Sequence, residues 1–162
     1  MRVMMMAGSG LIAAVLTVAV SAQSGAGSYM TAQAIDEALT AAGKVSRIGA
    51  STTVARTPTY HALVRRRSAS DTPQNAIVHP LSSEVYQIVD GAGTLVLGGV
   101  LDPPPGTQTL QLPNNVTSTG ISGGQTRRVA KGDVVVIPAG TPHWFQAIDG
   151  TITYLEVQFQ LK

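Results

Sequence analysis

From residue 60 onward the sequence is a succession of short β-strand patterns separated by turn-forming residues, and no other feature limits the fold as strongly. These stretches alternate polar with apolar residues or are rich in β-branched ones. The pair Asp90–Gly91 predicts a hairpin inside the longest of them. Together the stretches predict an all-β sandwich or barrel. The predicted strands lie within residues 60–67, 84–98, 133–137 and 150–159.

The N-terminal segment has the layout of a secretory signal peptide, which we expect to comprise residues 1–22. Arg2 gives it a basic start, an uncharged apolar run follows from Val3 to Val20, and small residues precede the expected cleavage after Ala22. A membrane anchor is the alternative, because the run approaches the roughly 18 residues that a minimal span requires. Cleavage predicts a secreted or periplasmic protein whose mature form has no membrane segment.

A short helix is expected between the signal peptide and the strands, within a segment of linker and helix over residues 23–50. Thr31 can cap the start of this helix, and Gly43 can end it. Ile35 and Leu39 lie on one side of it, at positions i and i+4. This single apolar stripe predicts that the helix packs against another element.

The barrel domain is then expected over residues 51–162, with a low-charge excursion at residues 101–126 that is rich in turn-forming residues. The chain has 11 Lys and Arg against 9 Asp and Glu. This weak balance argues against nucleic acid as a partner, because phosphates require a basic face. The dense run Arg65–Arg67 falls on a predicted strand, so we expect mostly solvated arginines and at most one that points inward. There is no cysteine, so a metal would be bound through nitrogen and oxygen.

Two histidines and a glutamate form the candidate centre. His79 and Glu84 would lie on opposite faces of one continuous strand, but Pro80–Ser83 supplies a turn between them. We therefore expect His79 to end one strand and Glu84 to begin the next. The stiff segment Pro138–Pro142 would position His143. Two imidazoles and one carboxylate suit Fe(II), Mn(II), Ni(II) or Zn(II) and leave positions open for water or substrate.

The same residues resemble the two motifs of the cupin family. The first motif, G-x5-H-x-H-x4-E-x6-G, matches in its second half through His79, Glu84 and Gly91. Ile77 stands where the family usually has another metal-binding histidine. In the second motif, G-x5-P-x-G-x2-H-x3-N, only the last position differs, where Ala147 replaces asparagine. The matching positions of this second motif are Gly132, Pro138, Gly140 and His143.

This resemblance, which extends over about residues 60–160, implies a cupin-type jelly-roll β-barrel with its pocket at one mouth. It also implies that His79, Glu84 and His143 are the ligands of a divalent transition metal. We expect Tyr86 and Trp144 to shape the pocket beside them.

His61 lies on the strand before the first motif and has two interpretations. It could replace the ligand that is missing at Ile77, or it could be a hydrogen-bonded histidine of the barrel, which we favour. In both cases it is expected near the pocket.

Three functions are compatible with these features. The first is a metal-dependent enzyme that acts on a small organic molecule. The second is a barrel that has lost its metal and binds a sugar or an organic acid without turnover. The third is a structural role as a homodimer. No serine nucleophile elbow and no phosphate-binding loop is present. The motifs specify neither the metal nor the reaction.

Overall fold

The computed structural model describes residues 27–46, 48–71, 74–103 and 115–161. The expected signal peptide lies outside the described residues, as does the part of the excursion at residues 104–114. Within the described ranges no helix is long and apolar enough to cross a membrane.

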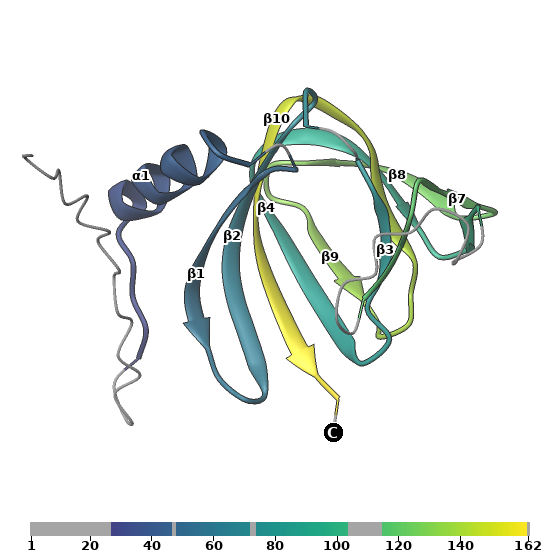
Figure 1. Ribbon diagram of the computed structural model, residues 1–162, viewed down its shortest axis with the longest axis horizontal. Coiled ribbons are helices and arrows are strands. Elements are labelled where there is room, and N and C mark those ends of the chain that lie inside the picture. The colour runs from purple at the N-terminus through teal and green to yellow at the C-terminus, as the bar shows by residue number, and fades with distance from the viewer. Residues whose placement is uncertain (1–26, 47, 72–73, 104–114, 162) are drawn as a thin grey trace, which may run out of the picture.

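The helix α1 (Ala32–Gly43) forms where the sequence predicts it. The side chain of Thr31 caps its start by accepting a hydrogen bond from the backbone N–H of Ala34 at 3.0 Å. Leu39 is buried, and with Ile35 it packs against Val64 of the neighbouring sheet. Figure 1 shows α1 on the outside of the barrel, beside β1 and β2. The apolar stripe thus attaches the helix to the outer face of the sheet.

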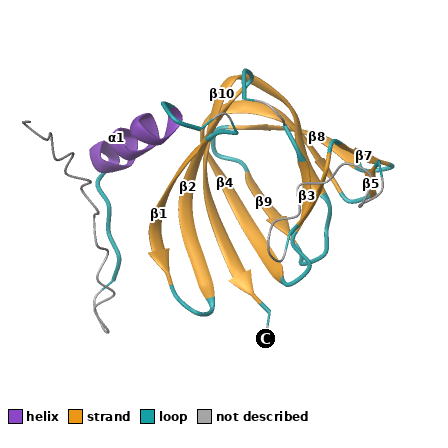
Figure 2. Cartoon of the chain, viewed as in Figure 1, coloured by secondary structure: helices purple, strands orange, loops and turns teal. Residues whose placement is uncertain are grey.

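The rest of the described chain is β-structure in which all paired strands are antiparallel (Figure 2). The strands are β1 (Ala50–Arg56), β2 (Tyr60–Ser68), β3 (Ala76–Val78), β4 (Ser82–Leu97), β5 (Val100–Asp102), β6 (Val116–Ser118), β7 (Gly120–Ser122), β8 (Gln125–Ala130), β9 (Val134–Ile137) and β10 (His143–Gln160).

The long strands β4 and β10 pair with each other along both of their halves and so belong to both walls of the barrel. In one wall the first half of β4 and the second half of β10 lie between β9 on one side and β2 and β1 on the other. In the other wall the second half of β4 and the first half of β10 lie between β8 and the pair β3 and β6. The strands β5 and β7 form a separate ribbon.

These two walls confirm the predicted all-β jelly-roll barrel, and Figure 1 shows them enclosing a common interior. The sheet is not closed, because among the described strands β1 pairs only with β2, and β9 only with β4.

The predicted hairpin at Asp90–Gly91 is wrong, because β4 runs through this point as one bent strand. Gly91 has a φ of 79°, and a Cβ atom there would lie 2.0 Å from the carbonyl oxygen of Thr151. Opposite it, the register of β10 shifts between Ile148 and Ile152. A glycine with positive φ serves a strand bend at a bulge as well as a turn, and here it permits the close approach of two bending strands.

The interior changes in character along β4 and β10. Near their bend the inward side chains are apolar, and we call this region the apolar end. Towards the start of β4 and the two ends of β10 they become ionisable or polar, and we call this region the polar end. The apolar end includes Ile88, Leu95, Val129, Ile148 and Ile152. The polar end includes His79, Glu84, His143, Glu156 and Gln158.

Candidate metal centre

His79 and Glu84 lie on either side of a tight turn, as the sequence predicts. β3 ends at Val78, and the N–H of Ser82 closes the turn by donating to the carbonyl of His79 at 3.4 Å. Along β4 the buried positions alternate, so Glu84 shares the inward face with Tyr86. The turn thus lets two residues five positions apart face the same interior.

His143 is the first residue of β10, where its backbone pairs with Ile77 of β3. The loop before it is fastened to the turn that follows β3. The N–H of Gly140 donates to the carbonyl of His79 at 2.9 Å, and the N–H of Ala139 donates to the hydroxyl of Ser83 at 3.1 Å. Gly140 has a φ of 76°, which suits a glycine. These hydrogen bonds thus hold the loop before His143 against the turn after β3, although the two are far apart in the sequence.

The three predicted ligands meet in the barrel. Nε2 of His79 lies 3.2 Å from Oε1 of Glu84, and Nε2 of His143 lies 3.1 Å from Oε2 of the same carboxylate. Each of the three residues offers one potential ligand atom, and these three atoms all lie within 4.8 Å of one another. All three residues are buried. The group is therefore compact enough to hold one cation.

The outer nitrogen of each imidazole has an acceptor, which fixes the tautomer. Nδ1 of His79 lies 2.5 Å from Oδ1 of Asn115, and Nδ1 of His143 lies 3.1 Å from the carbonyl of Thr141. An oxygen of this kind can only accept, so Nδ1 carries a hydrogen in both rings, and in the neutral form of each ring Nε2 presents its lone pair to the carboxylate. Metal-binding histidines in proteins show the same outer hydrogen bond.

Glu84 is held by two further donors. Nε2 of Gln158 donates to Oε1 at 2.6 Å, and the hydroxyl of Tyr86 donates to Oε2 at 3.0 Å. Burial alone would raise the pKa of Glu84, but hydrogen bonding and charge from His143, the charge of His79 and the Gln158 amide outweigh it and hold this pKa well below its usual range. Glu84 is therefore a charged carboxylate, the form that binds metals.

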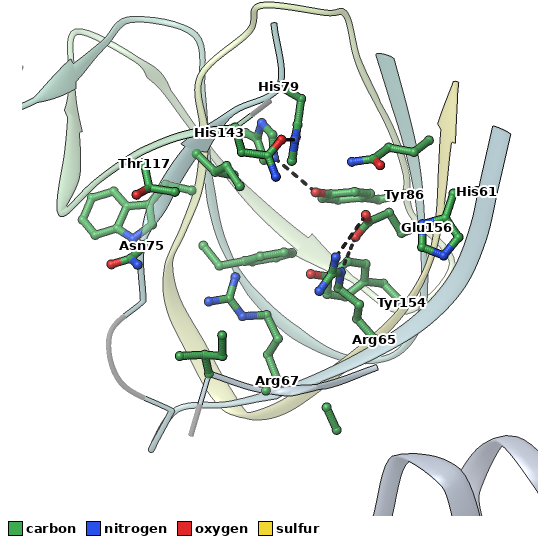
Figure 3. Close-up of a pocket in the computed structure, with 18 of the residues that line it drawn as sticks. His61, Arg65, Arg67, Asn75, His79, Tyr86, Thr117, His143, Tyr154 and Glu156 are labelled. Carbon is green, nitrogen blue, oxygen red and sulfur yellow. Dashed lines mark hydrogen bonds and ion pairs between the residues drawn. The ribbon is translucent and has the colours of Figure 1, made fainter. Parts of the chain in front are cut away.

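A cavity of about 420 Å³ adjoins this group, and Figure 3 shows it. The structure places His61, Tyr86 and Trp144 in its lining, where the sequence analysis expects them. His61 lies 3.1 Å from the hydroxyl of Thr53, and burial followed by the charges of Arg56 and Arg65 lowers its pKa. Because His61 is not part of the compact group, it does not replace the ligand missing at Ile77.

Sequence reasoning missed an ion pair inside the cavity. Nε of Arg65 lies 2.5 Å from Oε2 of Glu156, and Figure 3 shows the pair between β2 and β10. Arg67 lines the cavity as well, so two arginines of the basic run point inward, not at most one. The alternation of Tyr154, Glu156 and Gln158 along β10 is the signal that could have revealed this polar inner face.

An aromatic layer separates the polar end from the apolar end. The ring of Tyr86 lies 4.8 Å from that of Tyr154 and 6.4 Å from that of Phe145, measured between centroids. Burial first, and then the charge of Glu156, raises the pKa of Tyr154 to about 12. Burial raises the pKa of Tyr86 as well, so both tyrosines are neutral at ordinary pH, and the Tyr86 hydroxyl contacts Glu84 and His143 at the polar end.

The comparisons with known proteins agree with this architecture. The family model described as Cupin matches residues 40–160. No curated protein matches the chain.

Three solved structures illustrate the likeness. KdgF from Halomonas sp. is 19% identical, with 73% of this chain and 84% of that chain covered and a TM-score of 0.49. BH2720 from Bacillus halodurans is 13% identical, with 83% and 82% covered and a TM-score of 0.50. An Fe(II) form of HppE is 14% identical, with 69% of this chain but only 51% of that chain covered and a TM-score of 0.49. At such identities these likenesses concern the fold alone. With a family match over most of its length and an open jelly-roll barrel, the chain belongs to the cupin family.

Proposed function

We propose that the protein is an exported cupin that binds one divalent transition metal through His79, Glu84 and His143 and uses it to bind or transform a small organic molecule in the adjoining cavity. The buried group of two imidazoles and one carboxylate supports the metal. The cavity of about 420 Å³ supports a ligand of small-molecule size. The sequence pattern of residues 1–22 supports export.

The observation that carries the proposal is the orientation of the two imidazoles. Both Nδ1 atoms contact acceptors, so in the neutral rings, the form that binds a metal, both Nε2 lone pairs face carboxylate oxygens of Glu84 at 3.1 and 3.2 Å. Acceptors that face each other at this distance repel unless a proton or a metal cation lies between them. A divalent metal supplies that cation, and the donor set of nitrogen and oxygen fits Fe(II), Mn(II), Ni(II) or Zn(II).

A bound metal of this kind acts as a Lewis acid and lowers the pKa of coordinated water. The chain's own residues determine what reaches it. Three protein ligands leave coordination positions for water or a substrate oxygen. Tyr86 stands at the edge of the group, with its hydroxyl 3.2 Å from Nε2 of His143, so it can position a molecule that enters from the cavity.

The test is the metal content of the full chain, measured as purified and after incubation with each of the four metals. We expect about one equivalent in the wild type, and loss of binding in the double variant His79→Ala/His143→Ala. The matched control is His61→Ala, which removes a histidine from the same cavity and should keep the metal. Absence of metal from the wild type under all conditions, with the fold intact, would contradict the proposal.

The second candidate is a metal-free binding barrel, and two observations favour it. Glu84 already receives hydrogen bonds from Gln158 and Tyr86, so protons on the two imidazoles could complete the same cluster without a metal. Ile77, where the motif usually has a histidine, lines the cavity as an apolar residue. This candidate predicts that a ligand raises the unfolding temperature of the metal-free protein and that added metal changes nothing.

A further inference from the structure

Arg67 places a cation against apolar and aromatic walls. On β2 it is the partner of Ile152, a residue of the apolar end. Its Cζ lies 5.9 Å from the ring centre of Phe145, in the geometry of a cation–π contact. Figure 3 shows its side chain pointing from β2 into the cavity. A charged group in such surroundings is unfavourable unless something compensates it.

The described residues give Arg67 no acidic partner, although they give one to each of the two arginines directly before it. Arg65 pairs with Glu156, and Arg66 pairs with Asp36 of α1 at 2.8 Å. Arg67 is in no ion pair within the described ranges, and its Nε is buried without any hydrogen-bond acceptor. Of the two arginines of this basic run that line the cavity, Arg65 is thus neutralised by Glu156, whereas Arg67 keeps its charge.

Gln74 fixes the position of this charge without neutralising it. Its Oε1 accepts a hydrogen bond from Nη2 of Arg67 at 2.6 Å, while its own Nε2 donates to the carbonyls of Ser68 and Asp71 at 2.8 and 2.9 Å. The backbone carbonyl of Gln74 accepts from Nε1 of Trp144 at 2.6 Å. The guanidinium and the indole ring are thus held together on one side of the cavity, and the N–H of the indole is already used.

The cavity as a whole has an excess of positive charge. Among the described residues its lining contains three arginines, the third being Arg56, but Glu156 as its one carboxylate. Glu84 behind the lining reduces the excess, and a divalent metal would more than restore it. A neutral or cationic ligand would leave this excess uncompensated, whereas an anion would be attracted to it.

We propose that the cavity binds a small organic acid whose carboxylate pairs with Arg67, and whose second oxygen-bearing group reaches the centre at His79, Glu84 and His143. The planar guanidinium matches a carboxylate with two parallel hydrogen bonds. The rings of Trp144 and Phe145 supply contact area for the carbon part of the molecule. Only the contact of the second group with the centre at His79, Glu84 and His143 rests on the proposed function.

The test uses three probe acids, succinate, malate and salicylate, and titrates each into the full chain by calorimetry with and without bound Zn(II). The matching amides, succinamide, malamide and salicylamide, are the neutral controls. At least one acid should bind the wild type about 10-fold or more tightly than its amide, because a charged hydrogen bond is lost with the amide. Glycerol 2-phosphate serves as the competing oxyanion.

Variants locate the binding. Arg67→Gln should weaken the acid about 10-fold or more, and Arg67→Lys should retain part of the affinity, because it keeps the charge but not the planar fork. The matched control is Arg66→Gln on the same strand, whose side chain points to α1 and which should bind the acid as the wild type does. Circular dichroism of each variant checks the fold.

The outcomes separate this inference from the proposed function. Arg67→Gln should retain its metal, so acid binding that is lost while metal content is kept assigns the effect to the arginine. If the wild type binds no metal, Arg67-dependent binding of an acid by the metal-free protein still supports the inference. It would be overturned if no acid binds more tightly than its amide, if Arg67→Gln binds as the wild type does, or if only glycerol 2-phosphate binds.

Discussion

The two ends of the barrel interior are built by the same strands but have opposite chemistry. Near the bend of β4 and β10, Ile88 and Ile152 are almost wholly buried in an apolar cluster. A few residues further along the same inward faces, Glu84 and Glu156 are as deeply buried. Alternation decides which side chains point inward, and the identity of those side chains decides what each end does. The apolar end stabilises the fold, and it supports a polar end whose buried charges need compensation.

This difference predicts that truncation at the apolar end lowers stability far more than truncation on the exposed face of the barrel. Ile152→Ala should lower the free energy of unfolding by about 2–5 kcal/mol, because Ile152 is fully buried and its removal leaves a cavity. Metal content should not change. Urea denaturation measures the loss, and Val134→Ala on the exposed face of β9 is the control, expected within about 0.5 kcal/mol of the wild type. A loss below about 1 kcal/mol for Ile152→Ala would remove the distinction between the two ends.

The aromatic layer between the two ends predicts a loss of stability in alkali. The pKa of Tyr154 is raised from 10.0 to about 12, so above pH 10 the unfolded chain releases this proton while the folded chain keeps it. Stability is therefore full below pH 10 and is lost as the pH rises towards 12. In Tyr154→Phe this loss should be smaller by roughly 2 kcal/mol, since one pKa unit corresponds to about 1.4 kcal/mol.

Urea denaturation between pH 9 and 12 tests this expectation. Tyr29→Phe is the control, because Tyr29 is 83% exposed and lies outside the barrel interior. Identical pH profiles for Tyr154→Phe and the wild type would show that Tyr154 does not hold its proton in the fold.

At the polar end, the hydrogen bond from His79 to Asn115 predicts an effect on metal binding and not on stability. Asn115→Ala should weaken metal affinity about 10- to 100-fold, because the imidazole loses the acceptor that fixes its tautomer. A competition titration with a chelator measures it. Asn75→Ala, which removes another asparagine from the cavity lining, should leave affinity near that of the wild type. Equal losses in both variants would point to a general effect on the cavity.

The smallest effect is expected outside the barrel, where α1 meets the sheet. Asp36→Ala removes the ion pair with Arg66, and it should lower the free energy of unfolding by at most about 1 kcal/mol because Asp36 is largely exposed. Leu39→Ala on the same helix removes a buried side chain and should cost about 2–5 kcal/mol. Urea denaturation of both variants compares the contribution of the ion pair with that of the buried side chain. A larger loss of unfolding free energy for Asp36→Ala than for Leu39→Ala would contradict the expected order.

Local patterns made the helix and the three residues of the candidate metal centre predictable from the sequence. The cap at Thr31 and the stripe through Leu39 depend on neighbours in the chain, so they could be predicted without the fold. The meeting of His79 and Glu84 was predictable because the turn between them is local. The approach of His143 followed from a motif whose spacing is characteristic of the cupin barrel.

Features that depend on strand pairing could not be predicted. Arg65 and Glu156 are 91 positions apart, and only the register of β2 against β10 brings them together. Asn115 lies within the excursion, and nothing in the sequence indicates that it reaches His79. Gly91 misled the prediction, because a glycine with positive φ suits a hairpin turn and a strand bend equally well.

The most direct test of the proposed centre is X-ray absorption at the zinc edge of the Zn(II)-loaded full chain, which identifies the ligand atoms around the metal. We predict two imidazole nitrogens together with oxygen ligands, all at about 2.0–2.2 Å. Loss of the imidazole contribution in His79→Ala/His143→Ala would assign it to these residues. A metal with no imidazole ligand, or with a third one from His61, would contradict a centre built from His79, Glu84 and His143.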